Sequence, residues 1–495
     1  MVQPGFAAAL GTVAIGASAG HMQDEWSLST FGAAGPPSVT AKAAGPAGGA
    51  VDGFLLAYDG FDPATEGLRE ALTSTGNGYL CTRGAAEWED ADGVHYPGTY
   101  AHGGYNRETT ILSGLPVLNE DLVNLPNWLV LQLRIEGEDA IRLADVELLG
   151  YRHEFNLRNV TVLRHLRFRD RTGRETTLKS RRFVSMADPH HAGIEWTLVP
   201  ENWSGHVEVI SALDARVSNG GVARYQQLEG RHLNPVSPRT FGPEVIALKA
   251  ETRQSNLYIS QATRTRVFSG GQQLPVSRTL YQMEDYVQQV LAFDVHQGAA
   301  IRVEKMVSFY TSRDPAVSDT LVRAATSAAR HDEFAASFRR HSAAWDELWR
   351  ICDVRAPGND QVQLLIRLHI AHLLQVCSRH TADLDAGLPA RGLNGEAYRG
   401  HVFWDEMYAF PFLNVRLPEV ARELVKRGRD ASTPAAVICD GTTERQQVLV
   451  STLGQVAEDA AASGVRPPAV VVVGEVVRLR EALGQEPGRD TRGVA

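Results

Sequence analysis

The segment Trp128–Ile135, WLVLQLRI, decides the fold class, because it is a short run of apolar and β-branched residues near turn-forming positions. Similar runs recur between Gly53 and about residue 312, and no helical pattern separates them. They are residues 160–167, 193–199, 207–213, 257–260 and 301–310. Turn sequences such as Asp170–Gly173 and Ser218–Gly221 divide them. Many short strands without intervening helices predict a large antiparallel β-sandwich.

The spacing of apolar residues becomes helical after Asp314-Pro315. Residues from about 316 to 351 repeat apolar side chains at helical intervals, with Ser318 as the expected N-cap. Residues 361–377 carry a second strong helical pattern, and a further helix is expected to begin near Trp404. These patterns predict a helical linker followed by the start of a helical domain.

The C-terminal part changes character once more. Residues 434–439, 446–451 and 468–473 have strand patterns, and residues 453–463 have a helical one. This order is typical of a small α/β fragment rather than of a helical barrel. The two ends of the chain have neither pattern. Residues 1–51 form a Gly/Ala/Pro-rich segment that is expected to be a flexible leader, and residues 484–495 form a polar tail.

Composition narrows the classes of function. The 495 residues carry a net charge of −9, which argues against a nucleic-acid or anionic-membrane partner. The apolar run Ala469–Val473 is too short to span a bilayer, and the N-terminal region has no Lys or Arg before Lys42, unlike a secretory signal. The four cysteines match neither a zinc spacing nor a disulfide framework, so we expect reduced thiols in a cytoplasmic protein.

Several aromatic, glycine and acidic blocks occur in a distinctive order. The last of them is GLPARGLNGEAYRGHVFWDE at residues 387–406. The earlier blocks are Tyr58–Pro63, Gly76–Tyr79, Tyr96–Tyr100, Asn119–Trp128 and Val199–Gly205. Over about residues 52–420 the chain thereby resembles glycoside hydrolase family 65. The resemblance implies a β-sandwich at 52–312, a helical linker at 313–351 and the start of an (α/α)6 barrel at 352–420.

The resemblance implies an inverting phosphorylase acting on an α-linked glucose disaccharide such as trehalose, maltose or kojibiose. In that family a glutamic acid protonates the leaving oxygen while inorganic phosphate attacks from the opposite face, and no other cofactor is needed. Trp404 and Asp405 would contact the glucose, and Arg399 and His401 would orient nearby groups. The residue types suit this task, because an indole stacks on the apolar face of a pyranose and a carboxylate accepts its hydroxyl hydrogens. The family also suggests a homodimer.

The same residues have simpler structural interpretations. Trp404 could be a core aromatic at a helix start, with Asp405 placed favourably at the helix N-terminus. Glu396 is a tempting general acid, but the acid of the family lies well beyond this block, so no catalytic residue is predicted here. The pair His190-His191 lacks further ligands at metal spacing, and a packing role is expected for it, with no metal site.

The family pattern weakens near residues 417–425, after about two of the twelve expected barrel helices. Residues 421–483 resemble instead the end of uroporphyrinogen-III C-methyltransferase, through the blocks Thr433–Val437, Asp440–Thr443 and Val472–Val477. That resemblance implies that Gly441 binds S-adenosylmethionine, whereas a hairpin turn is the structural alternative. The sequence thus predicts a fusion of two partial enzymes, truncated before the catalytic acid and inactive. The alternatives are methyltransferase activity and a non-catalytic carbohydrate-binding β-sandwich.

Overall fold

A computed structural model describes residues 53–382, 384, 386–403, 405–417, 432–439, 446–452, 454–464, 469–473 and 475–478. These residues fall into two compact units that divide between His401 and Val402. The expected leader at 1–51 and tail at 484–495 lie outside the described residues, as do Trp404 and Gly441. Within the described residues, none of the helices has both the length and the apolar character that crossing a membrane requires.

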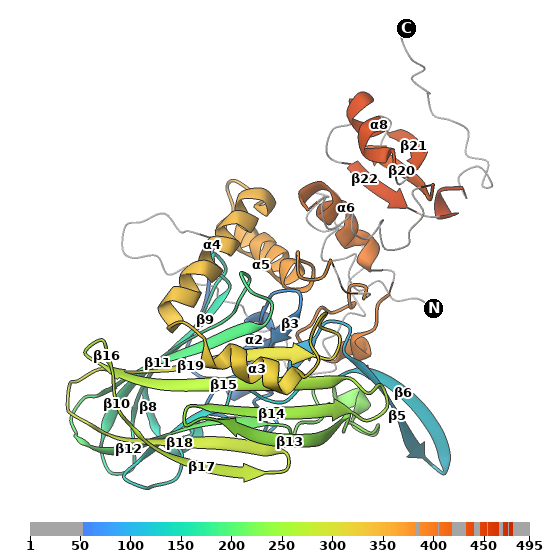
Figure 1. The fold of residues 1–495 in the computed structure, drawn as a ribbon. Helices are drawn as coiled ribbons and strands as arrows, with labels where there is room; N and C mark the ends of the chain where they lie inside the picture. Colours follow the sequence, from blue (N-terminus) through green and yellow to red (C-terminus); the bar gives the residue numbers. More distant parts are fainter. Residues whose placement is uncertain are drawn as a thin grey trace. The chain divides into compact units, whose positions relative to one another are not determined.

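The larger unit is built on two antiparallel sheets, as the strand patterns predicted (Figure 1). The ten-stranded sheet contains, in spatial order, β1 (Leu55–Asp59), β8 (Glu147–Asn156), β9 (Thr161–Arg169), β10 (Glu175–Val184), β11 (His191–Pro200), β19 (Ile301–Thr311), β15 (Tyr258–Ser269), β14 (Val245–Thr252) and β13 (Leu233–Phe241), with β16 (Gln272–Gln273) paired to β15. The four-stranded sheet has the order β17 (Ser277–Met283), β18 (Tyr286–Val295), β12 (Gly205–Asp214) and β7 (Leu131–Ile135).

The core lies between the inner faces of these two sheets. It joins Leu133, Val209 and Leu291 of the smaller sheet to Trp196 and Val303 of the larger one, all almost fully buried. Alternation of apolar and polar residues produces one-sided burial in strands such as β7 and β9, whereas β15 and β19 are buried on both faces. The expected strand at 128–135 begins only at Leu131, and Trp128 is buried ahead of it and donates its indole N–H to Thr82.

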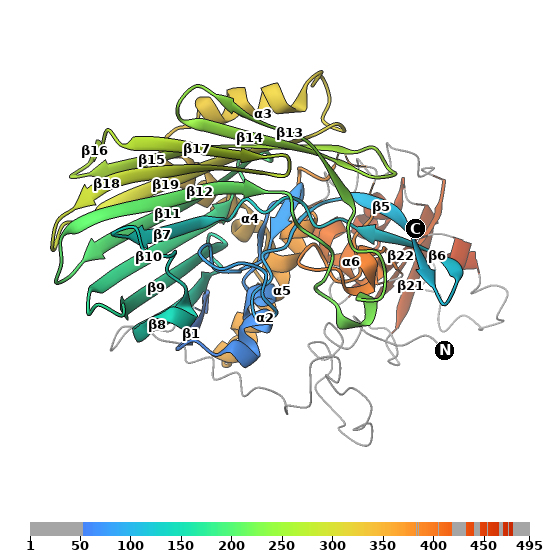
Figure 2. The same cartoon turned by 90° about the horizontal axis from the view of Figure 1, so that it is seen from below.

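Several smaller elements complete the larger unit. They are the short sheet β2 (Thr75–Gly76), β3 (Leu80–Thr82) and β4 (Thr99–Ala101), the hairpin β5 (Tyr105–Leu112) and β6 (Leu115–Leu122), and the 3-10 turns η1 (Leu143–Asp145) and η2 (Ala223–Tyr225). The hairpin projects from the body of this unit (Figure 2). The helix α2 (Pro63–Leu72) corrects the expectation of a helix-free segment, and it starts there because Asp62 caps it and Pro63 suits its first turn.

The predicted linker is helical, and its cap is one residue later than expected. The helix α3 (Thr320–Ala329) is capped by Asp319, whose carboxylate accepts from two backbone N–H groups, and not by Ser318. It packs through Leu321 and Ala324 on the outer face of the ten-stranded sheet (Figure 1). The helices α4 (Phe334–Cys352) and α5 (Asp360–Val376) follow, and Asn359 caps the latter. The 3-10 turn η3 (Ala397–Gly400) comes last in this unit.

The smaller unit holds α6 (Glu406–Arg416), β20 (Pro434–Cys439), β21 (Gln447–Thr452), α8 (Val456–Ala462), β22 (Ala469–Val473) and the 3-10 turn η4 (Glu475–Arg478). Its strands have the order β21-β20-β22 and are antiparallel. The predicted order of strands and helix is found there. A closed barrel is not found among the described residues, since α5 and α6 are the only helices there that could belong to it. The barrel therefore remains a prediction.

Candidate functional site

The glycine-rich segment 387–401 follows α5 and lies against the end of the sandwich. Its first residue is fixed by His102, a fully buried histidine whose Nε2 lies 2.8 Å from the Gly387 carbonyl oxygen. Arg83 donates to the Asn394 carbonyl oxygen at 2.8 Å. These contacts join residues separated by about three hundred positions in the sequence. The segment is therefore shaped by the sandwich rather than by its own local preferences.

Three consecutive residues of this segment have left-handed backbone conformations. Tyr398, Arg399 and Gly400 have φ values of 56°, 54° and 69°. For the two residues other than glycine this conformation costs about 1–3 kcal/mol each, so contacts from elsewhere must hold it. The Tyr105 hydroxyl donates to the Gly400 carbonyl oxygen at 2.5 Å, and the His401 Nε2 lies 2.7 Å from the Glu120 carbonyl oxygen. Strain of this kind is common where a loop presents side chains to a ligand.

Glu396 fastens the start of this turn. Its side chain is buried and accepts hydrogen bonds from the Tyr100 hydroxyl at 2.9 Å, from the Gly221 N–H at 2.8 Å and from the Tyr96 hydroxyl. Burial raises the pKa of this carboxyl above its ordinary value, and the three donors oppose that rise. Because three donors occupy Glu396, its geometry indicates an anchor for the loop more than a group presented to a substrate.

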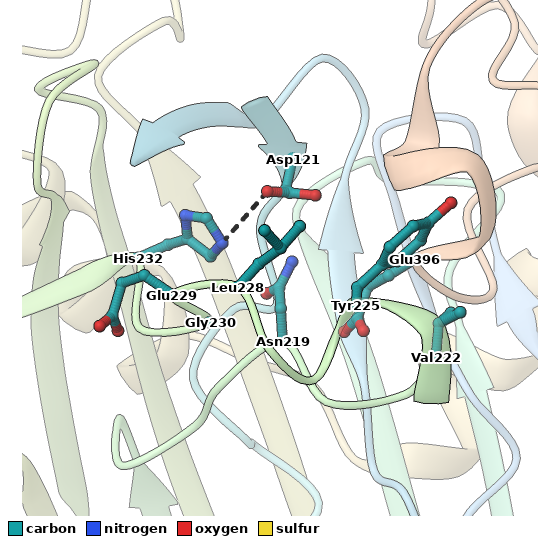
Figure 3. A pocket seen from close by; sticks show the side chains of 9 residues that line it. All are labelled: Asp121, Asn219, Val222, Tyr225, Leu228, Glu229, Gly230, His232 and Glu396. Carbon is teal, nitrogen blue, oxygen red and sulfur yellow. Dashed lines mark ion pairs between the residues drawn. The ribbon is translucent and has the colours of Figure 1, made fainter. Parts of the chain in front are cut away.

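A small pocket lies beside this anchor (Figure 3). Its lining includes Asp121, Tyr225, His232 and Glu396, and its volume is about 10 Å³. The His232 Nε2 lies 3.8 Å from Asp121 and has no hydrogen-bond partner among the described residues, and burial lowers the pKa of His232. A volume of this size admits a water molecule and not a pyranose ring. The pocket is thus a small, partly open hollow beside the loop rather than a sugar site.

The structure brings together two of the predicted sugar-site residues. Arg399 and His401 share the loop, and the Arg399 guanidinium lies 5.8 Å from the ring centre of Tyr225. Asp405 precedes α6 in the other unit and makes no side-chain capping bond there. Trp404 and Gly441 lie outside the described residues, so their predicted roles are untested. A joint sugar site formed by all of these residues is still a prediction.

Sequence reasoning missed the groups that hold the loop. Tyr96 and Tyr100 stand in the block YPGTY, which supported the resemblance but was given no role, and the partner Gly221 was noted only as a turn residue. Nothing in their local pattern points to a carboxylate some 300 residues away. Only a contact through the folded chain reveals them.

One buried group of carboxylates and histidine could be taken for a metal centre. Ligand atoms of Glu66, Glu70 and His95 lie within 4.8 Å of one another. However, Arg69, Arg83 and Arg164 have guanidinium nitrogens 3.5–3.9 Å from these carboxylates. Three positive charges at that range oppose a cation, so this group does not carry a metal assignment.

The histidine pair and the cysteines have structural surroundings. His190 stacks on Tyr310 with ring centres 4.1 Å apart, and the His191 Nε2 lies 3.0 Å from the Ser327 hydroxyl. Cys81, Cys352, Cys377 and Cys439 are all free and buried, in agreement with the expectation of core thiols.

Comparison with known families gives two matches in succession. The family described as glycosyl hydrolase family 65, N-terminal domain, matches residues 56–348, and the central catalytic domain of the same family matches residues 367–436. The second match extends past residue 420, where the sequence pattern placed the end of family resemblance. The two matches together cover the sandwich, the linker and the glycine-rich segment.

Individual relatives agree with these matches. An uncharacterized glycosyl hydrolase of Mycobacterium tuberculosis is 42% identical over 374 residues, which are 76% of this chain and 28% of that protein. A kojibiose phosphorylase of Caldanaerobacter subterraneus subsp. tengcongensis is 28% identical over 381 residues, 75% of this chain and 47% of that protein. The chain therefore spans half or less of the length of these relatives. A solved structure titled "Putative kojibiose phosphorylase from human microbiome" matches with a TM-score of 0.64 at 20% identity, over 76% of this chain and 48% of that one, which shows a shared fold.

Proposed function

Since this chain belongs to glycosyl hydrolase family 65, we propose that it recognises an α-linked glucose disaccharide through the segment 387–406. The observation that supports the proposal most directly is the strained turn at Tyr398–Gly400, which the sandwich holds from both sides. Backbone strain that the surrounding fold maintains at one loop is typical of a functional site. Sugar recognition is the task that the relatives' names suggest for it.

Four residues carry the proposed recognition. Trp404 stacks on the apolar face of the glucose, and Asp405 accepts hydrogen bonds from its hydroxyls with the assistance of its charge. Arg399 and His401 orient the neighbouring groups, and the second of them is itself fixed by the Glu120 carbonyl oxygen. Inorganic phosphate is the proposed co-substrate of the complete reaction, because an inverting phosphorylase uses it in place of water.

We do not assign the catalytic proton to Glu396. A general acid must be within hydrogen-bond reach of the leaving oxygen, and the Glu396 carboxyl is occupied by Tyr96, Tyr100 and Gly221. The family resemblance implies that the general acid stands beyond the glycine-rich segment. The proposal for residues 387–406 is therefore binding of an α-glucoside, and the catalytic proton is assigned to none of them.

Calorimetry and a phosphorolysis assay test this proposal together. We expect heat of binding with kojibiose, trehalose or maltose, and the phosphorolysis assay reports whether glucose 1-phosphate forms when phosphate is added. Trp404→Ala and Asp405→Asn should each weaken binding at least tenfold, about 1.4 kcal/mol, whereas Arg171→Ala, at an exposed arginine of the sandwich, should leave it unchanged. Phosphate-dependent glucose 1-phosphate would show that a catalytic acid is present after all. Absence of binding with all three sugars would refute the recognition itself.

The smaller unit supplies the alternative. S-adenosylmethionine-dependent methyl transfer rests on the resemblance of residues 421–483, and its named residue, Gly441, is not described. The antiparallel order β21-β20-β22 lacks the parallel strand ends at which open α/β sheets bind such ligands. We expect no transfer of a labelled methyl group to uroporphyrinogen III, and its detection would favour the alternative. A cytoplasmic location fits the four buried free cysteines and is proposed on that ground.

A further inference from the structure

The last turn of α3 brings together a serine, a histidine and an aspartate. Ser327 belongs to α3, which lies on the outer face of the ten-stranded sheet (Figure 1). His191 is the first residue of β11, and Asp188 stands in the segment before it. The Ser327 hydroxyl oxygen lies 3.0 Å from Nε2 of His191, and Oδ2 of Asp188 lies 3.4 Å from Nδ1 of the same ring. In this arrangement a histidine can activate a serine as a nucleophile.

The two contacts of the ring determine the direction of the serine hydrogen bond. A neutral imidazole carries a proton on one nitrogen only. The carboxylate of Asp188 favours that proton on Nδ1, so Nε2 keeps its lone pair and accepts the hydrogen of the Ser327 hydroxyl. The distance of 3.4 Å exceeds an ordinary hydrogen bond, and contacts of this kind are often loose before a substrate binds. His191 is therefore placed as a base for Ser327.

Neighbouring groups hold the histidine and the aspartate in place. The ring of His331 packs edge-on against the ring of His191, with the ring centres 4.2 Å apart. Oδ1 of Asp188 accepts the backbone N–H of His190 at 2.9 Å, and the N–H of Asp188 donates to the Ser185 hydroxyl at 3.1 Å. These contacts leave Oδ2 of Asp188 to face the imidazole. The orientation of the three side chains is thus supported by the surrounding structure.

A second serine–histidine pair nearby shows what distinguishes this group. The Ser308 hydroxyl oxygen lies 2.8 Å from Nε2 of His331, but both of these side chains are buried. In the group at α3 the side chains of His191 and Asp188 are 21% and 43% exposed, and Ser327 is half-buried. A small molecule in solution can therefore reach the serine and the histidine of the second group and not those of the first.

We propose that Ser327, His191 and Asp188 form a hydrolytic site, separate from the proposed sugar site, that acts on small carboxylic esters. The Ser327 oxygen forms a bond to the ester carbonyl carbon while its proton passes to Nε2 of His191. The bond from that carbon to the alcohol oxygen then breaks, and the alcohol leaves with this proton. A water molecule next attacks the acyl-serine and gives a proton to the same nitrogen. The carboxylic acid leaves, and the proton returns to the Ser327 oxygen.

The electrostatic surroundings of His191 suit a base at neutral pH. The charged and titratable groups around its ring are Asp188, His190, His331, Asp332 and Arg340. Burial lowers the pKa of His191 below its ordinary value, and the positive charge of Arg340 acts in the same direction, whereas the charge of Asp188 opposes it. The imidazole is therefore neutral and able to accept a proton. The charge of Arg340 would also favour the negative oxygen of the tetrahedral intermediate.

Hydrolysis of p-nitrophenyl acetate by the purified full chain tests the activity. Ser327→Ala should lower the protein-dependent rate at least about tenfold, and so should Asp188→Asn, whose amide no longer favours a proton on Nδ1 of His191. Ser318→Ala is the matched control, because Ser318 is exposed ahead of α3 and lies outside the site, so the rate should not change. The rate of the unaltered chain should be level between about pH 7 and 8, since His191 is already neutral there. A rate that keeps rising and is equal in Ser327→Ala overturns the proposal.

A fluorophosphonate identifies the nucleophile directly. Its phosphorus forms a bond to the oxygen of an activated serine, and fluoride leaves while the serine proton passes to the base. Mass spectrometry of the digested chain should find the label on Ser327 and not on Ser308 or Ser318. His191→Gln should abolish the labelling, because the glutamine amide is no base. An unlabelled Ser327 in the folded chain overturns the proposal. Neither experiment bears on the proposed sugar binding, in which Ser327 has no part.

Discussion

The interior of the sandwich and the loop at 387–401 are held in opposite ways. In the sandwich, strands adjacent in the sheets bury their own apolar residues, such as Trp196 and Val303, against one another. The loop has its decisive contacts with distant polar groups, the hydroxyls of Tyr100 and Tyr105 and the Gly221 N–H. The sandwich is stabilised by contacts within itself, and the loop is stabilised by contacts with the sandwich. The dependence should therefore run in one direction.

Damage to the sandwich is expected to disturb both regions. Trp196 is 1% exposed, and Trp196→Ala removes one of the largest fully buried side chains of the core. The loss should be about 3–5 kcal/mol of unfolding free energy, measured by urea denaturation. Hydrogen exchange should rise both in β11 and in residues 397–401. Leu118→Ala, at an exposed site, serves as the control and should cost less than about 0.5 kcal/mol. Unchanged exchange in the loop would mean that it does not depend on the sandwich.

Damage to the loop anchor is expected to remain local. Glu396→Ala leaves the Tyr100 hydroxyl and the Gly221 N–H without their acceptor, at a cost of roughly 2 kcal/mol. Because this cost falls on the loop and its supports, amide exchange of residues 397–401 should accelerate at least tenfold. Exchange of β11 and β19 should stay as in the unaltered protein. A comparable acceleration in those strands would show that the two regions unfold together.

This difference also explains which parts of the fold could be predicted from the sequence alone. The strands at 161–169, 205–214 and 301–311 were predicted close to their observed ends, because a strand in a sandwich has a local apolar pattern. The cap of α3 was misplaced by one residue, since Ser318 and Asp319 are both good caps and only the geometry of the chain selects between them. The helix α2 was missed because its start was taken only as part of a family block.

The candidate site was predicted less completely for the same physical reason. Arg399 and His401 were named because they stand in a distinctive block, and the loop does carry both. The groups that shape the loop lie in β4, β5 and the turn at Gly221, and their roles depend on contacts about 175 to 300 residues apart. A pattern of residues along the chain contains no signal for such contacts.

A pair of glycines separates backbone strain from crowding. Gly400 and Gly242 have nearly the same φ, 69° and 70°, but a side chain at Gly400 would meet Leu122 and one at Gly242 would meet nothing within 4 Å. Gly242→Ala should cost about 1 kcal/mol from the left-handed conformation alone. Gly400→Ala should cost about 1 kcal/mol more by urea denaturation, with faster exchange at 397–401. Equal losses of unfolding free energy for the two variants would mean that Leu122 of the β5–β6 hairpin moves easily and does not hold the loop in place.

The smallest expected effect is a dependence on pH. Burial raises the pKa of Glu396 above 4.5 in the folded chain, so between pH 4.5 and that raised value the folded state binds more protons than the unfolded state. Stability therefore falls as pH rises through this range. Glu396→Gln cannot titrate, so its unfolding free energy relative to the unaltered protein should increase with pH over the same interval, as measured by urea denaturation. Glu284→Gln, at an exposed carboxyl, should show no such trend. The opposite slope would mean that the hydrogen bonds from the two tyrosine hydroxyls and the Gly221 N–H outweigh the effect of burial and stabilise an ionised Glu396. These hydrogen bonds would then hold the loop more strongly than a pKa raised by burial implies.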